Sequence, residues 1–133
     1  MRAGRVTLVL AVAGLVAAGC GGSSGKAAGG GNPGPVQHPA SLVGDVGHND
    51  EFLISLKDPS GAPIRNLAAG TYQVKVDDES GIHNFHLTGS GVNKLTSVSG
   101  TGSQTWTVNF SPGTYTFLCD THPTQMKSKF TVS

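Results

Sequence analysis

The segment GTYTFLCDTHPTQM, residues 113–126, decides the fold and holds several of the most reactive side chains in the chain. Its first half has the alternation of a β-strand, in which successive side chains face opposite sides. Tyr115, Phe117 and Cys119 therefore share one face. If the two aromatic rings are buried, the thiol of Cys119 lies on the core side at the end of this strand.

Short alternating runs of this kind recur through the rest of the chain, and no apolar periodicity of helical length accompanies them. They are separated by turns rich in glycine and proline. The runs lie at residues 51–57, 72–76, 83–87, 106–110 and 130–132. We predict an all-β protein, a β-sandwich of seven to eight short strands.

Two phrases, AGTY at residues 69–72 and PGTY at residues 112–115, look like a repeat. We interpret them as one turn-to-strand solution used twice. In each case the tyrosine, Tyr72 or Tyr115, is expected to pack at a corner of the sandwich.

Upstream of the cysteine, the segment GIHNFH at residues 81–86 supplies two imidazoles. His83 shares strand parity with Phe85 and is expected to face the core, whereas His86 has the opposite parity. We assign no functional role to His86, His48 or His38 and expect them to be solvated rather than metal-ligating.

Four side chains then form a recognisable donor set: the thiolate of Cys119, the imidazoles of His83 and His122, and the thioether of Met126. Thiolate and thioether suit cuprous copper, and imidazole suits both oxidation states. Each residue alone has an ordinary structural explanation, as a small buried hydrophobe, a core histidine or a gap filler. Their combination favours a copper site that passes electrons.

The segment from Gly113 to Pro123 resembles the copper loop of the cupredoxins, with plastocyanin and amicyanin nearest in pattern. The IHNFH segment, residues 82–86, is similar to the upstream ligand segment of amicyanin. The likeness covers about residues 50–133. It implies a Greek-key, cupredoxin-like sandwich holding one type 1 copper ion.

Carried over residue by residue, the resemblance implies that His83, Cys119 and His122 are the equatorial copper ligands and Met126 the weak axial one. Asn84 would tie the two ligand loops together by hydrogen bonds. Strong equatorial bonds fix the trigonal plane, while a long thioether contact tunes the reduction potential.

The chain departs from the family pattern in two places near the axial position. Three residues separate His122 from Met126, a spacing between the shorter amicyanin-like and the longer plastocyanin-like loops. Ser128 also stands where the family often has glycine. Gln125 is therefore an alternative axial ligand, through its amide oxygen.

The first residues read as an export signal. Arg2 and Arg5 precede an apolar run over residues 6–18, which is too short to span a bilayer comfortably. The run ends in AAGC, which resembles a bacterial lipobox and predicts that Cys20 is lipidated. An ordinary secretory signal with a chance cysteine is the alternative.

We predict a signal peptide over residues 1–19, a flexible tether rich in glycine and proline over residues 20–40, and a folded domain over residues 41–133. The chain has only two cysteines, Cys20 and Cys119. A disulfide between them would staple little structure, so we expect the two to have separate roles.

Charge narrows the function further. The formal net charge is +1, and removal of Arg2 and Arg5 with the signal would make it −1. A near-neutral surface has no electrostatic footprint for nucleic acid. No Ser/His/Asp or paired-carboxylate arrangement indicates catalysis, and residues 77–79 are expected to form a solvated acidic loop.

The leading hypothesis is therefore a monomeric electron carrier, not an enzyme, tethered by lipid to a membrane at the extracytoplasmic cell envelope. It would exchange electrons with transient redox protein partners. A copper-binding or copper-delivery lipoprotein is the alternative. A structural sandwich with a vestigial site is a third interpretation.

Overall fold

A computed structural model describes residues 40–133, which form nine β-strands and one short 3-10 helix. The predicted signal peptide, the predicted lipidation site at Cys20 and residues 20–39 of the predicted tether lie outside the described residues, whereas Ala40 is the first residue of β1. Within the described part of the chain, no helix is long and apolar enough to cross a bilayer.

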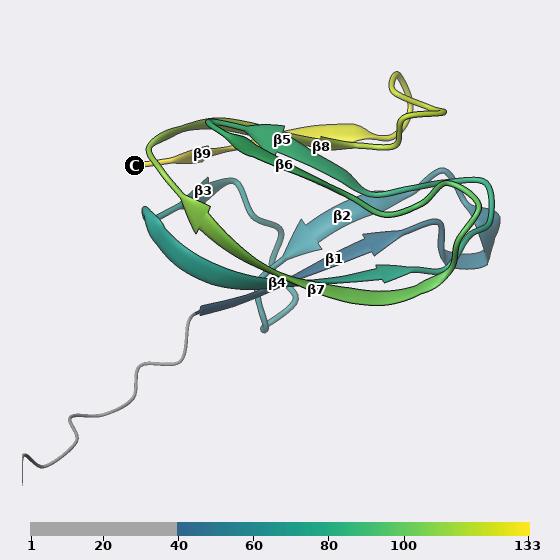
Figure 1. Ribbon diagram of the computed structural model, residues 1–133, viewed down its shortest axis with the longest axis horizontal. Helices are drawn as coiled ribbons and strands as arrows, with labels where there is room; N and C mark the ends of the chain where they lie inside the picture. Colours follow the sequence, from purple (N-terminus) through teal and green to yellow (C-terminus); the bar gives the residue numbers. More distant parts are fainter. Residues whose placement is uncertain (1–39) are drawn as a thin grey trace, which may run out of the picture. The chain divides into compact units, whose positions relative to one another are not determined.

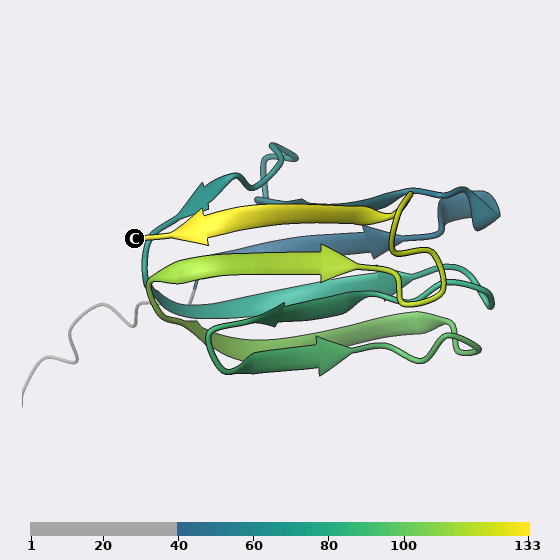
Figure 2. The same ribbon diagram turned by 90° about the horizontal axis from the view of Figure 1, so that it is seen from above.

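The strands form two sheets that lie face to face (Figure 1). The first sheet has the order β2 (Ile54–Lys57), β1 (Ala40–Val46), β4 (Gly70–Asp78) and β7 (Gly102–Phe110). The second has the order β3 (Asn66–Leu67), β9 (Lys127–Val132), β8 (Gly113–Leu118), β5 (His86–Gly89) and β6 (Val92–Leu95). Figure 2 shows β9, β8, β5 and β6 side by side across the second sheet. The 3-10 helix η1 (His48–Asp50) follows β1.

Both sheets are mixed, because β1 pairs with β4 and β3 pairs with β9 in parallel, while the other strand pairs are antiparallel. The core lies between them and follows the alternation predicted from the sequence. In β4, for example, Val74 and Val76 are fully buried while Lys75 is exposed. The rings of Phe85 and Phe117 stack within the core, with centroids 5.5 Å apart.

The all-β sandwich is confirmed, with nine strands rather than seven or eight. Two strands also begin later than predicted. The run at residues 51–57 becomes regular only at Ile54, and the run at residues 83–87 only at His86. Immediately before His86, the backbone amides of Asn84 and Phe85 donate to side-chain atoms instead of to a neighbouring strand.

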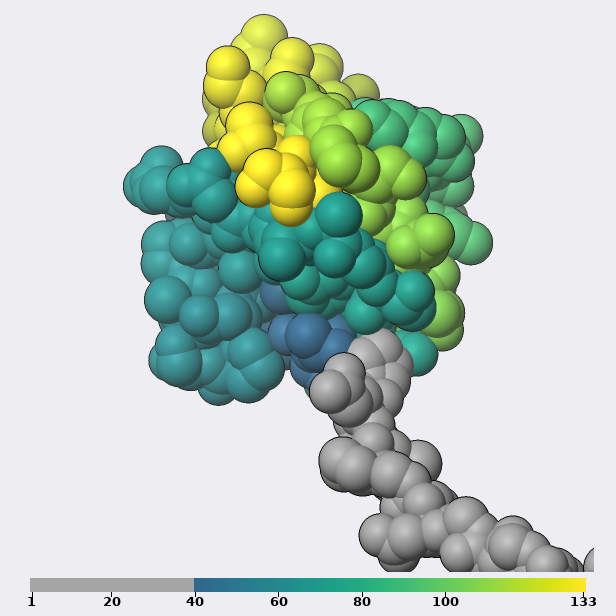
Figure 3. All heavy atoms as spheres, turned by 90° about the vertical axis from the view of Figure 1, so that its left-hand side faces the viewer, coloured from purple at the N-terminus to yellow at the C-terminus, as the bar shows by residue number. Residues whose placement is uncertain are grey.

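The repeated tyrosine phrase is one structural solution used twice, as predicted. The hydroxyl of Tyr72 donates to the carbonyl of Ala68, and that of Tyr115 to the carbonyl of Ser111, each at 3.0 Å and four residues back. The hydroxyl of Tyr115 also accepts from the amide of Ser111 at 3.1 Å. Both tyrosines lie near the starts of their strands, β4 and β8, at the same end of the sandwich, which we call the Tyr115 pole. Figure 3 views the molecule from the end at which these two strands start.

The opposite end, the Cys119 pole, gathers the loops that carry the predicted ligands. Parallel pairing of Val46 with Asp78 brings the ends of β1 and β4 together. The loops that leave them, residues 47–53 and 79–85, therefore start side by side. The loop of residues 119–126, between β8 and β9, closes the same pole (Figure 1).

Candidate metal centre

Three predicted ligands converge at the Cys119 pole. Nδ1 of His83, Sγ of Cys119 and Nδ1 of His122 all lie within 4.8 Å of one another. The sulfur is 3.7 Å from each nitrogen, and the two nitrogens are 2.9 Å apart. His83 and Cys119 are fully buried, while His122 is partly exposed.

These separations fit a shared metal ion. Sulfur and nitrogen ligands bonded at about 2.3 and 2.05 Å to one metal lie about 3.8 Å apart in a trigonal plane. The observed sulfur–nitrogen distances of 3.7 Å match this spacing. The two imidazole nitrogens stand closer together, at hydrogen-bonding distance, so His83 and His122 would separate slightly to admit an ion.

The structure distinguishes Met126 from its alternative, Gln125, by burial. Met126 is 0% exposed and belongs to the core, whereas Gln125 is exposed and its Oε1 accepts from the hydroxyl of Thr124 at 2.6 Å. Two backbone hydrogen bonds of 2.9 Å fix the position of Met126. Its amide donates to the carbonyl of His122, and its carbonyl accepts from the amide of Cys119. The thioether is therefore the inward-facing side chain of the two.

The ring of His83 is oriented by the loop of residues 47–53. Nε2 lies 3.4 Å from the carbonyl oxygen of Asp50, which can only accept, so a proton on Nε2 would donate to this oxygen and leave Nδ1 free to ligate. Gly47 makes this approach possible, with φ of +68°. A Cβ there would lie 2.4 Å from Cβ of Ser80 and 3.0 Å from Cδ2 of His83.

Asn84 joins the two ligand loops. Its side chain accepts from the amide of Asp120 at 2.8 Å and donates to the Asp120 carboxylate at 2.7 Å and to the carbonyl of Thr96 at 3.3 Å. Its own backbone amide donates to Sγ of Cys119 at 3.4 Å. A hydrogen bond to sulfur stabilises negative charge on the thiolate, the form that binds metal.

Two neighbours of the centre were not predicted. Phe52 packs edge-on against both imidazoles, with its ring centroid 5.2 Å from that of His83 and 4.7 Å from that of His122. The hydroxyl of Thr121 lies 3.1 Å from Sγ of Cys119 and donates to the carbonyl of Ile82 at 3.1 Å. The sequence pattern carries no signal for the contacts of Phe52 with the imidazoles or of Thr121 with Ile82, because each joins loops that meet only in the folded chain.

His86 lies outside the centre, as its parity indicated, but it is not simply solvated. Its Nδ1 bonds to Asp120 and its Nε2 to Asn93, both at 2.7 Å. Burial alone would lower the pKa of His86, but the hydrogen bonds to Asp120 and Asn93 outweigh it, so the pKa is raised. For Asp120, burial opposes the change, and the hydrogen bonds from His86 and Asn84 lower the pKa of the carboxyl.

The prediction of a solvated acidic loop over residues 77–79 is wrong for its middle member. Asp77 and Asp78 extend β4, and their side chains take opposite faces of the strand. Asp78 is consequently buried inside the Cys119 pole, where it accepts a hydrogen bond from Thr96.

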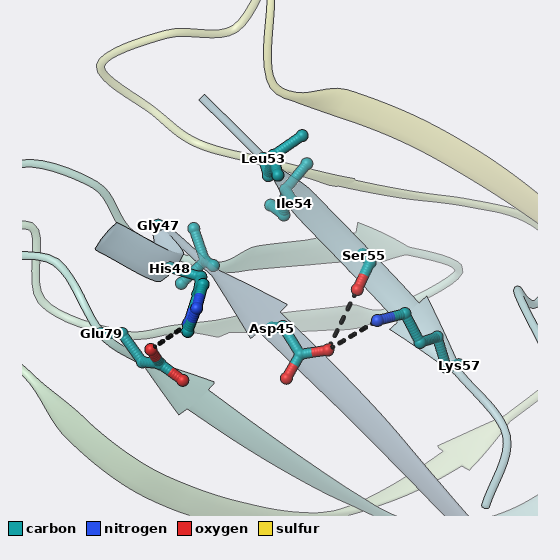
Figure 4. A pocket seen from close by; sticks show the side chains of 9 residues that line it. Asp45, Gly47, His48, Leu53, Ile54, Ser55, Lys57 and Glu79 are labelled. Carbon is teal, nitrogen blue, oxygen red and sulfur yellow. Dashed lines mark hydrogen bonds and ion pairs between the residues drawn. The ribbon is translucent and has the colours of Figure 1, made fainter. Parts of the chain in front are cut away.

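A surface pocket of about 430 Å³ lies close to the centre, beside the loop of residues 47–53 (Figure 4). Its charged side chains already pair with one another. Asp45 accepts from Ser55 at 3.1 Å and from Lys57 at 3.2 Å, and His48 bonds to Glu79 at 2.6 Å. Function is therefore better sought at the three converging ligand atoms than in this pocket.

No protein-family model matches the chain, and no curated protein matches it. Several solved structures do. Reduced rusticyanin superposes with a TM-score of 0.53 at 20% identity, over 70% of this chain and 78% of that one. Rusticyanin from Thiobacillus ferrooxidans gives 0.51 at 19% identity, over 70% and 76%. A further structure of the copper protein rusticyanin gives 0.53 at 18% identity, also over 70% and 76%.

The fold is cupredoxin-like. At this level of identity the likeness establishes the architecture and leaves the site to be argued from its own residues. The predicted cupredoxin-like sandwich is thus confirmed. The nearer resemblance to plastocyanin and amicyanin remains a prediction, because the three structures compared here are rusticyanins.

Proposed function

We propose that the protein is a blue copper electron carrier, with one copper ion held by His83, Cys119, His122 and Met126. The observation that carries the proposal is the convergence of two imidazole nitrogens and one sulfur within 4.8 Å at one pole of a cupredoxin-like sandwich. That donor set, completed by a buried thioether, is the one typical of blue copper sites. It resembles no arrangement for breaking substrate bonds.

Copper bound there would supply one-electron chemistry by alternating between Cu(II) and Cu(I). The chain contributes a fixed set of ligand positions. Asp50 holds the ring of His83, Asn84 donates to the sulfur of Cys119, and backbone hydrogen bonds close the loop on either side of Met126. Ligands held this firmly rearrange little between oxidation states, which favours rapid electron transfer.

His122 is the best placed ligand to pass electrons to a partner, because its ring is the one that reaches the surface. Exposed apolar side chains lie on the loops of this pole: Phe52, which contacts His122, Leu53 and Ile82 are 52%, 59% and 52% exposed. We propose that a transient redox protein docks here and gains or loses one electron as copper loses or gains it. Such encounters need only small, weak interfaces, and the carrier itself would act as a monomer.

A redox titration of the copper-loaded protein tests this function. We expect one copper per chain and a reversible one-electron transition in the wild type, and neither a visible colour nor that transition in Cys119→Ser. Copper that binds tightly but is released on reduction would instead favour the copper-delivery alternative.

We further propose that the protein is anchored to a membrane at the cell envelope through lipidated Cys20. The AAGC sequence after an apolar run supports this. Ala40, the first described residue, pairs with Tyr72 at the Tyr115 pole, at the opposite end of the sandwich from the predicted copper ligands. Acyl chains contribute about 0.8 kcal/mol per buried CH₂, and two or more give stable anchoring.

Fractionation of cells tests the anchor. Wild-type protein should sediment with membranes, and Cys20→Ala should move it to the soluble fraction without changing its absorption spectrum. Fully soluble wild-type protein after export would support the plain secretory signal instead.

A further inference from the structure

Asp78 places a carboxylate inside the Cys119 pole. The side chain is only 3% exposed. Its Oδ2 accepts from the hydroxyl of Thr96 at 2.5 Å, and its Oδ1 from the backbone amide of Ser80 at 3.3 Å. Among the ion pairs of residues 40–133, none joins Asp78 to a lysine or arginine. A buried carboxylate without a cationic partner is costly, which calls for a reason.

The two carboxylate oxygens hold both ends of the loop that carries His83. One oxygen binds the amide of Ser80, three residues before the histidine. The other binds Thr96, whose hydroxyl accepts from the amide of Phe85 at 2.9 Å and whose own amide donates to the carbonyl of Phe85 at 3.0 Å. Asp78 therefore connects the two ends of the loop that carries His83, and it fixes the position of the imidazole between them.

The same carboxylate bears on the charge of the centre. Burial raises the pKa of Asp78, while the hydrogen bonds from Thr96 and Ser80 and the attraction of His83 act in the opposite direction. Through these hydrogen bonds the carboxylate is connected to Ser80 and to Phe85, on either side of His83. Because Asp78 is buried, solvent screens its charge only weakly.

We propose that Asp78 is a positioning and charge-tuning residue for the copper centre, an inference that rests on the proposed function. With one thiolate ligand, the oxidised centre carries one more positive charge than the reduced one. A buried carboxylate beneath His83 stabilises that extra charge and lowers the reduction potential. Asp78 also holds the loop that presents His83.

Replacement by the near-isosteric amide tests the charge, and the chain offers a matched control. Asp77, the residue before Asp78, faces the other side of β4 and pairs with Lys75 at 2.9 Å. Asp78→Asn should shift the Cu(I)/Cu(II) equilibrium at least about tenfold toward Cu(I), or about 59 mV for a one-electron couple. Asp77→Asn should shift it less than about twofold, because solvent screens an exposed pair.

The possible outcomes distinguish failure of the proposed electron-carrier function from failure of the role proposed for Asp78. A wild-type protein without a copper–thiolate band means that the proposed function has failed. A normal band with equal potentials for wild type and Asp78→Asn, or equal shifts for both asparagine variants, overturns the charge-tuning role.

The positioning role has its own test, which keeps Asp78 in place. In the metal-free protein, Thr96→Val removes the hydroxyl between Asp78 and the amide of Phe85. Hydrogen exchange at that amide should accelerate at least about tenfold, and Thr96→Ser, which keeps the hydroxyl, should restore slow exchange. Unchanged exchange in Thr96→Val overturns the positioning role even if Asp78→Asn does not fold.

Discussion

The two poles of the sandwich use similar loops for opposite purposes. At the Tyr115 pole, the hydroxyls of Tyr72 and Tyr115 satisfy carbonyls four residues back, so each turn closes on itself. At the Cys119 pole, the three predicted ligand atoms come together from two loops, and the hydrogen bonds of Asn84 run between those loops. One pole stabilises the fold, and the other holds reactive groups in place.

This difference separates stability from function within a small domain. Substitutions at the Tyr115 pole should weaken the fold and leave the centre's spectrum unchanged. Substitutions at the Cys119 pole should alter the centre and spare most of the stability.

The sharpest contrast lies within the Cys119 pole, between two histidines three residues apart. His83→Ala removes a donor and should abolish the visible band and one-to-one copper binding. His86→Ala should leave both nearly unchanged, because His86 bonds to Asp120 and Asn93 outside the centre. Equal loss of copper from the two variants, measured by metal analysis and absorption, would show that the wrong imidazole has been assigned.

Changes at the axial position should tune the centre without emptying it. A thioether favours Cu(I) and an amide oxygen favours Cu(II). Met126→Gln should therefore lower the reduction potential, and Met126→Leu, which removes the donor, should raise it. Gln125→Ala should do little. A large shift in Gln125→Ala with none in Met126→Leu would reassign the axial ligand.

At the Tyr115 pole, replacement of either tyrosine should change the free energy of unfolding, by different amounts, and leave the copper centre unchanged. Tyr115→Phe removes two hydrogen bonds between the buried hydroxyl and the backbone of Ser111, and should cost about 1–3 kcal/mol of unfolding free energy. Tyr72→Phe loses a single hydrogen bond, which is more exposed to solvent, and should cost about 0.5–1.5 kcal/mol. Denaturant titration of the metal-free protein measures both. An altered copper band in either variant would break the separation between the poles.

The smallest expected effect depends on pH. The raised pKa of His86 means that its ion pair with Asp120 stabilises the fold below the ordinary histidine pKa of 6.5, and this stability is lost as pH rises through the folded value. The pKa of Asp120 is lowered, so the contribution of its carboxylate to stability is lost only as pH falls through the pKa of Asp120 in the folded protein.

In the metal-free protein, His86→Gln should therefore be most destabilised relative to the wild type at pH values between the folded pKa of Asp120 and that of His86. At alkaline pH its stability should approach that of the wild type. His48→Gln is the matched control, because its pair with Glu79 is largely exposed. A stability difference for His86→Gln that does not vary with pH would contradict the ion pair.

Much of this arrangement could be read from the sequence. Strand parity placed Cys119 beside Phe117 on the core face, and it separated His83 from His86. The roles of Asn84 and of the axial position came from the resemblance to cupredoxins. Residue type and spacing were sufficient for these features because successive side chains along a strand point to opposite faces of the sheet.

Contacts between loops could not be read in the same way. The carbonyl of Asp50 meets His83, and Phe52 covers both imidazoles, only because the parallel pairing of β1 with β4 brings distant turns together. Asp78 was expected in a solvated turn, but β4 continues through it and turns its side chain inward. Such contacts depend on strand register and strand ends, which a single sequence specifies weakly.

The central claim is that Cys119 bonds copper in a centre shared with His83 and His122. The visible absorption spectrum of the oxidised, copper-loaded protein tests it most directly. We predict an intense thiolate-to-copper charge-transfer band in the wild type and its complete loss in Cys119→Ser, with the β-sheet circular dichroism retained. A wild type that binds copper without this band, or a band that survives in Cys119→Ser, would contradict the claim.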